Sequence, residues 1–183
     1  SDGGGAGAPQ VNPGPAPANG NVPAPTPLPA PTLPNYYTRA ITATASITGA
    51  TIASPTTVEF SLVDGDGIAL TGLTSANVRF HIAKLIPAAD GDSSHWQSYI
   101  NRNKHATVSG APQSSAIQAT SESGGTLVDH GDGTYTYTSR IDVRSVTTPT
   151  AVVYEPNLTH RVGFQFSGGP ALNPTYDWVP ASN

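Results

Sequence analysis

The stretch VRFHIAKLIPAADGDSSHWQSYINR, residues 78–102, decides the fold because it joins a clear strand pattern to a long polar excursion. Val78, Phe80 and Ile82 alternate with Arg79, His81 and Ala83, so one face of a pleated strand is apolar. The strand is expected to end near Pro87, which removes a backbone donor, and turn-forming residues follow it. The pattern predicts a half-buried β-strand and by itself identifies no chemistry.

Other short segments show the same two-residue period, and turn residues separate them. The clearest is a hairpin around the turn 129–133, with Tyr135 and Tyr137 on one face. No segment shows a convincing helix of three turns. This arrangement predicts an all-β fold, either an antiparallel sandwich or a Greek-key barrel. The expected strands are 39–48, 57–63, 127–128, 134–138, 151–154, 160–167 and 176–179, with a possible short strand at 116–120.

The first 36 residues differ in composition from the rest of the chain. Residues 1–35 contain one charged residue, Asp2, in a sequence dominated by Pro, Ala and Gly. Such a segment cannot bury enough apolar surface to offset the entropy lost on ordering. We therefore expect a disordered or extended, polyproline-like linker over residues 1–36 and a β-barrel or β-sandwich domain over residues 37–183.

Charge and hydropathy exclude several classes of partner. Charged residues are 11% of the chain and the formal net charge is −4, without the clustered Lys and Arg of a nucleic-acid-binding surface. No apolar run approaches the roughly 18 residues of a membrane-spanning helix. The chain has no cysteine, which excludes disulfides, thiolate metal sites and the C-x-x-C-H motif that attaches c-type haem.

Two aspartates, Asp64 and Asp66, are candidate calcium ligands because carboxylates one residue apart can donate oxygens to that ion. Asp-Gly pairs are also ordinary turn formers, and neither the bidentate glutamate nor the spacing of an EF-hand loop follows. The same holds for Asp129 and Asp132. We therefore predict turns and no tight calcium site.

The residues offer no enzyme signature. The five histidines lack the spacing of a zinc enzyme, and surface or capping roles are expected for them. No G-x-S-x-G elbow singles out a nucleophilic serine.

Trp96 and Tyr99 could form an exposed aromatic surface for a flavin, a sugar or a neighbouring domain. Alternatively, they could be core residues or a lid over one end of the barrel.

The central stretch also resembles the N-terminal, haem-free domain of outer-surface decahaem c-type cytochromes of the OmcA/MtrC type. The resemblance begins near Tyr37 and continues to the end of the chain. It is carried by FHIAKLIP (80–87), SHWQSYINR (94–102), FSLVD (60–64), TGLT (71–74), GTLVD (125–129), GDGTYTY (131–137), LTHRVG (158–163) and NPTYDWVP (173–180).

The resemblance implies a Greek-key split-barrel domain without cofactor, catalytic or metal-binding residues, belonging to a protein whose other domains bind haem c. It further implies the extracellular face of the bacterial outer membrane, a porin–cytochrome complex as partner, and a lipid anchor before Ser1, because residues 1–5 resemble the start of such lipoproteins. Contact with the haem-bearing domains is expected at Trp96, Tyr99, His160 and Arg161. The ending at Asn183, after the last family-like strand, predicts a domain boundary.

Two functions follow as alternatives. In the favoured one, the chain is not itself an enzyme but a structural domain of an electron-transfer cytochrome that reduces metal oxides or flavins. In the other, it is a bacterial cell-surface Ig-like adhesion or ligand-binding module on a Pro-rich stalk. Ligand binding would depend on aromatic residues, namely Trp96, Tyr99, Tyr176 and Trp178.

Overall fold

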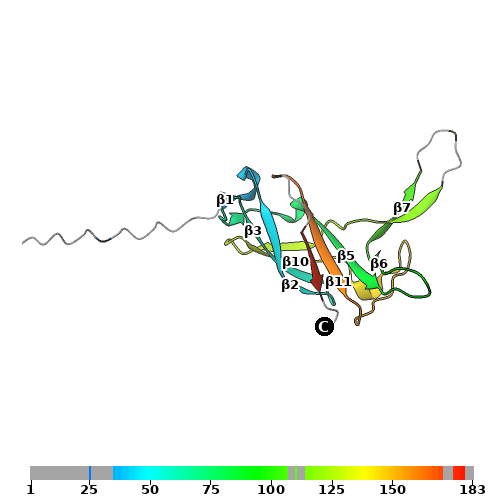
Figure 1. The fold of residues 1–183 in the computed structure, drawn as a ribbon. Helices are drawn as coiled ribbons and strands as arrows, with labels where there is room; N and C mark the ends of the chain where they lie inside the picture. Colours follow the sequence, from blue (N-terminus) through cyan, green and yellow to red (C-terminus); the bar gives the residue numbers. More distant parts are fainter. Residues whose placement is uncertain (1–24, 26–34, 107–109, 111–113, 171–174, 180–183) are drawn as a thin grey trace, which may run out of the picture. The chain divides into compact units, whose positions relative to one another are not determined.

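Two four-stranded antiparallel sheets face each other in the computed structural model (Figure 1). It describes residues 25, 35–106, 110, 114–170 and, for the backbone only, 175–179. The first sheet has the strand order β2-β3-β10-β9, and the second has the order β12-β11-β5-β6. These strands are β2 (Thr44–Thr51), β3 (Thr57–Val63), β5 (Val78–Ile86), β6 (His95–Ser98), β9 (Thr126–Asp129), β10 (Thr134–Thr138), β11 (His160–Phe166) and β12 (Thr175–Val179).

Smaller elements complete the described part of the chain. β1 (Asn35–Tyr36) pairs in parallel with β4 (Leu70–Thr71), and β7 (Asn101–His105) pairs with β8 (Ser115–Ala119) as a separate ribbon. Three single-turn 3-10 helices, η1 (Tyr37–Arg39), η2 (Ser75–Asn77) and η3 (Val143–Ser145), connect strands. Among the described residues no helix is long and apolar enough to span a bilayer.

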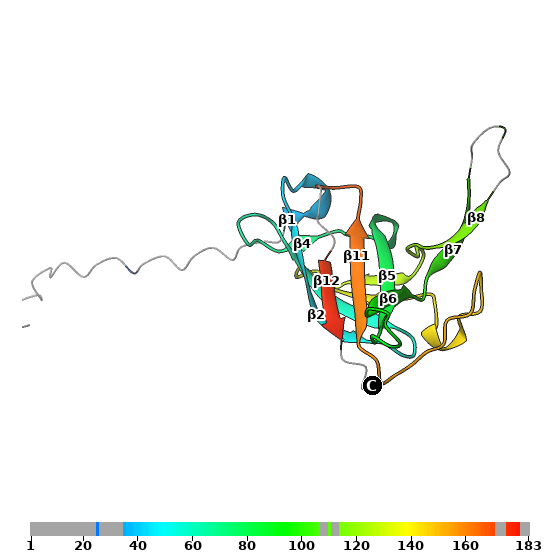
Figure 2. The same ribbon diagram turned by 45° about the vertical axis from the view of Figure 1, so that its right-hand side comes forward.

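The topology is that of a Greek-key sandwich that does not close into a barrel. The pairings of β3 with β10 and of β5 with β11 join distant parts of the chain. β12 lies beside β2 at one edge (Figure 2), where the two sheets approach without sharing a ladder. The all-β, antiparallel, split-barrel or sandwich prediction is confirmed.

An aromatic core fills the space between the sheets. Phe60 of β3 stacks on Tyr135 of β10 with ring centroids 5.1 Å apart, and it meets Phe164 of β11 at 4.8 Å. Phe164 also meets Phe80 of β5 at 5.7 Å and the edge of Tyr137 at 5.4 Å. Each ring occupies the core-facing position of its alternating strand, so the period seen in the sequence selects the residues that pack here.

A buried carboxylate, Glu122, joins the two sheets. Its backbone pairs with Phe80 of β5 in both directions, with N–O distances of 3.0 and 2.9 Å. Its side chain, which is 3% exposed, accepts hydrogen bonds at the end of β10. The donors are the Tyr137 hydroxyl at 2.7 Å, the Ser139 hydroxyl at 3.0 Å, the Arg140 amide at 2.9 Å and the Ile141 amide at 3.1 Å.

Two expected strands differ from the structure. The first one, 39–48, begins at Thr44, because Thr44 pairs with Val63 and β3 ends there before its turn. The alternation beginning at Ile41 therefore has no partner strand, and Ile41 is 93% exposed. The expected strand 151–154 is irregular, and the carbonyl of Val153 accepts from a side chain. Sequence period indicates which face is apolar but not whether a partner strand is present.

Replacement of Glu122 by Ala should lower the free energy of unfolding by about 3 kcal/mol, because two buried hydroxyls and two part-buried amides lose their acceptor. Glu122→Gln should cost less than half as much, since an amide oxygen can still accept from three of them. Urea denaturation measures both, with the exposed Glu59→Ala as the matched control. Equal losses in the free energy of unfolding for Glu59→Ala and Glu122→Ala would contradict the role of Glu122 as a buried acceptor.

Candidate functional site

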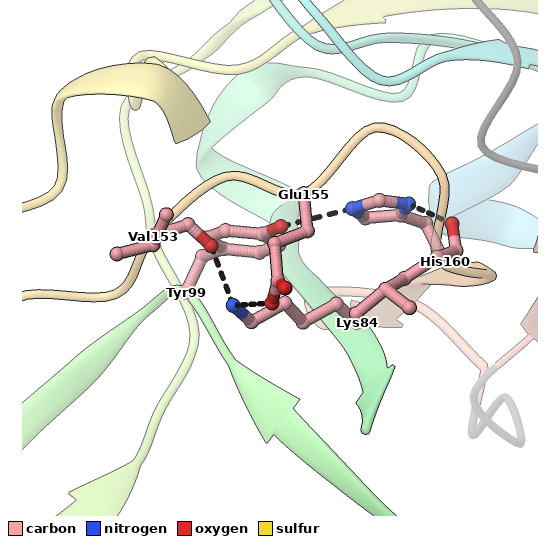
Figure 3. A network of polar contacts seen from close by, with 6 residues as sticks. Lys84, Tyr99, Val153, Glu155 and His160 are labelled. Carbon is pink, nitrogen blue, oxygen red and sulfur yellow. Dashed lines mark hydrogen bonds and ion pairs between the residues drawn. The ribbon is translucent and has the colours of Figure 1, made fainter. Parts of the chain in front are cut away.

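A cluster of polar side chains lies at the C-terminal end of β5, where the sheet meets the segment 153–160 (Figure 3). Lys84 is in phase with Val78, Phe80 and Ile82, so its side chain points inward and is 3% exposed. Its Nζ donates to the Val153 carbonyl at 2.5 Å and to Glu155 Oε2 at 2.6 Å. A buried ammonium is thus neutralised by one carboxylate and satisfied by one carbonyl.

Tyr99 and His160 form the second half of the cluster. The Tyr99 hydroxyl lies 2.9 Å from His160 Nε2, and His160 Nδ1 lies 2.9 Å from the Leu158 carbonyl. A carbonyl can only accept, so Nδ1 carries the hydrogen and Nε2 accepts from the hydroxyl. The two rings stack with centroids 5.7 Å apart, and Lys84 Nζ lies 5.9 Å from the Tyr99 ring centroid.

Burial keeps both rings of this pair uncharged. It lowers the pKa of His160, and the nearby Lys84 acts in the same direction against the opposing influence of Leu158 and Glu155. Burial also raises the pKa of Tyr99. The cluster therefore contains one ion pair and one neutral tyrosine–histidine pair, and both hold the segment 153–160 against the end of the sheet.

Of the four expected interface residues, the structure brings two together on the outer face of the second sheet. Arg161 of β11 lies with its guanidinium carbon 6.0 Å from the Trp96 ring centroid, and both side chains are half-buried. They border a hollow of about 210 Å³ whose other walls include His81, Ala83 and Gly163. Tyr99 and His160 are buried, which leaves Trp96 and Arg161 as the two that reach the surface.

The remaining aromatic candidates, Tyr176 and Trp178, lie in β12. The backbone register of β12 pairs Tyr176 with Gly163 and Trp178 with Arg161. Their side chains lie outside the described residues.

The calcium candidates lie in a turn. Asp64 Oδ1 accepts from the amides of Asp66 and Ile68, each at 2.9 Å, and Oδ2 accepts from the Asn35 amide group at 3.0 Å. These hydrogen bonds hold the pKa of Asp64 below its ordinary value, and the one from the Ile68 amide has the largest effect. Both oxygens of Asp64 thus stabilise the turn, and the described residues contain no group of three or more potential metal-ligating side chains.

The expectation of surface roles for the histidines is wrong for His160, which is fully buried. His160 is in phase with Val162 and Phe164 on β11, and this alternation was the signal that it faces the core. His81 is half-buried on the opposite face, and burial lowers its pKa. The others, His95, His105 and His130, are exposed.

The residues of this chain cannot attach a c-type haem covalently. Covalent attachment of c-type haem requires the cysteines of C-x-x-C-H, and the sequence has none.

The neutral His160 should make stability depend on pH. Its folded pKa lies below the ordinary 6.5, so in the window between these values the unfolded state binds a proton that the folded state does not. The free energy of unfolding should therefore fall as the pH falls through 6.5, and His81 should add to the slope. Urea denaturation of His160→Gln should show a smaller slope, and the exposed His105→Gln an unchanged one. An unchanged slope in His160→Gln would refute this explanation.

The ion pair should respond asymmetrically to mutation. Glu155→Ala leaves the ammonium of Lys84 buried with one carbonyl partner, and we expect a loss of about 1–2 kcal/mol, moderated because Glu155 is 47% exposed. Lys84→Met removes the charge, keeps an apolar stem, and should cost less than half of this. Thermal unfolding compares the two with the exposed Lys104→Met as a control. A larger loss of stability in Lys84→Met than in Glu155→Ala would contradict the conclusion that the unpaired ammonium of Lys84 is the main cost.

The family model of the OmcA-like N-terminal domain matches residues 44–183. The crystal structure of the outer membrane decaheme cytochrome OmcA is 33% identical with a TM-score of 0.69 and matches 79% of this chain but 24% of its own. MtrC from Shewanella baltica OS185, at 21% identity and a TM-score of 0.50 over 75% of this chain and 21% of its own, shares the fold.

No curated protein sequence matches. The chain spans about a quarter of the length of the first of these structures. With a family model that extends over both sheets, and with the fold shared by both cytochromes, the chain belongs to the family of OmcA-like N-terminal domains.

Proposed function

We propose that this chain is the haem-free N-terminal domain of a cell-surface multihaem cytochrome that passes electrons to extracellular acceptors such as metal oxides or flavins. The observation that carries the proposal is the family match over residues 44–183 in a chain without cysteine. A domain that cannot attach haem, but whose relative OmcA is a decaheme cytochrome, contributes structure and not electron carriers.

The domain would pack beside the haem-bearing part of the same protein. The half-buried pair of Trp96 and Arg161 supports this, because an aromatic ring beside a guanidinium is frequent at protein–protein contacts. The Pro-rich residues 1–36 would separate the domain from a lipid anchor on the extracellular face of the outer membrane, near a porin–cytochrome complex. The pairing of Asn35–Tyr36 with β4 supports a β domain that begins at or before residue 35.

The intact mass and visible spectrum of the protein from its native source test this proposal. The expected result is a mass far above that of 183 residues, together with the Soret band of attached c-type haem. A mass matching this chain, without visible absorbance, would contradict it and would favour a surface adhesion or ligand-binding module.

A further inference from the structure

A two-stranded ribbon, β7 (Asn101–His105) and β8 (Ser115–Ala119), projects from the sandwich in both views (Figures 1 and 2). It forms a sheet of its own, and apart from Asn101 at its base every residue of both strands is exposed. An isolated hairpin of this size is only marginally stable in water, and its outer edges offer unpaired backbone groups. Such an element is expected to have a partner.

The register of the ribbon separates its two faces. Arg102 pairs with Gln118 and Lys104 with Ala116, so both cations lie on one face, about 7 Å apart along the strand. The other face contains Asn103 opposite Ile117, which is 47% exposed. We call the side with Arg102 and Lys104 the basic face.

The segment that contains the basic face has charged residues of one sign only. No Asp or Glu occurs in residues 93–121, so the formal charge of −4 divides into +2 on this segment and −6 on the rest of the chain. The two ion pairs among the described residues, Lys84–Glu155 and Arg144–Asp142, do not involve the ribbon. The basic face is therefore complementary to a surface rich in carboxylates.

We propose that the ribbon is a docking arm whose basic face binds carboxylates on the haem-bearing part of the same polypeptide, an inference that rests on the proposed function. Every haem carries two propionates, so a multihaem partner supplies the complementary charge. Exposed ion pairs contribute little individually. Two of them suffice only where the partner is already held at high effective concentration, as a domain of the same chain is.

Zero-length cross-linking of the full-length native protein with a water-soluble carbodiimide tests the arm. The reagent joins an amine to a carboxylate in contact with it, and the sequence has only two lysines, Lys84 and Lys104. Lys84 is 3% exposed and lies 2.6 Å from Glu155, so the Lys84–Glu155 cross-link is an internal reference for the reaction. Lys104 is the exposed lysine and reports on the arm.

The expected product, identified by peptide mass spectrometry, joins Lys104 to a carboxylate outside residues 1–183. Its yield should fall several-fold in Arg102→Gln and in high salt, and should be unchanged in Arg79→Gln, which neutralises an exposed arginine of β5. The Lys84–Glu155 cross-link should form in both variants.

Three results would overturn the proposal while leaving the reference cross-link intact: unmodified Lys104, Lys104 joined to a residue of this domain, or Lys104 joined to a second copy. A native protein without haem would instead contradict the proposed function. A haem-containing protein with unmodified Lys104 would contradict the docking arm alone.

Discussion

The carboxylate of Glu122 is the interaction on which the sandwich depends, because it ties one sheet to the other through a single residue. Its backbone extends the edge of β5 beside Phe80, and its side chain collects four donors at the end of β10. A buried charge is costly unless hydrogen bonds replace its hydration, and here backbone amides and hydroxyls do so. The hydrogen bonds of Glu122 therefore stabilise the alignment of the two sheets around the aromatic core.

Lys84, near the C-terminal end of β5, is a second buried charged group that specific partners stabilise. The segment between η3 and β11 forms no ladder with a sheet, so backbone groups that have no backbone partner need side-chain partners. Lys84 supplies one for Val153, and His160 supplies one for Leu158. A cation at a core-facing position thus fixes an irregular segment that apolar packing alone would leave unaligned, and the pairing with Glu155 keeps its desolvation tolerable.

These two polar centres do not extend to the outer face of the second sheet or to the β7–β8 ribbon. The hollow beside Trp96 and Arg161 lies on the face of β5 and β11 opposite the core, and the β7–β8 ribbon extends beyond the sandwich altogether. Neither surface contains a residue of the Glu122 or Lys84 hydrogen-bond clusters. A domain built this way can change its outer contacts without loss of stability.

The sequence by itself determined the fold class and most core positions. Strict alternation put Phe60, Phe80, Tyr135, Tyr137 and Phe164 on inward faces, and the matched bounds of β3 show how well the period marks a strand with turns at both ends. It also fixed the absence of haem attachment, because that chemistry requires a residue type that the chain lacks.

Only the tertiary structure decided what each inward or irregular residue touches. The Tyr99–His160 pair, the Glu122 acceptor set and the Lys84–Glu155 ion pair join residues 15 to 71 positions apart. The β7–β8 pairing joins two polar segments with no apolar face to align them. The two-residue period of a strand indicates which face a side chain lies on. A buried polar group is tolerated only where the fold places a hydrogen-bonding partner beside it, and the assembled sheets determine that placement.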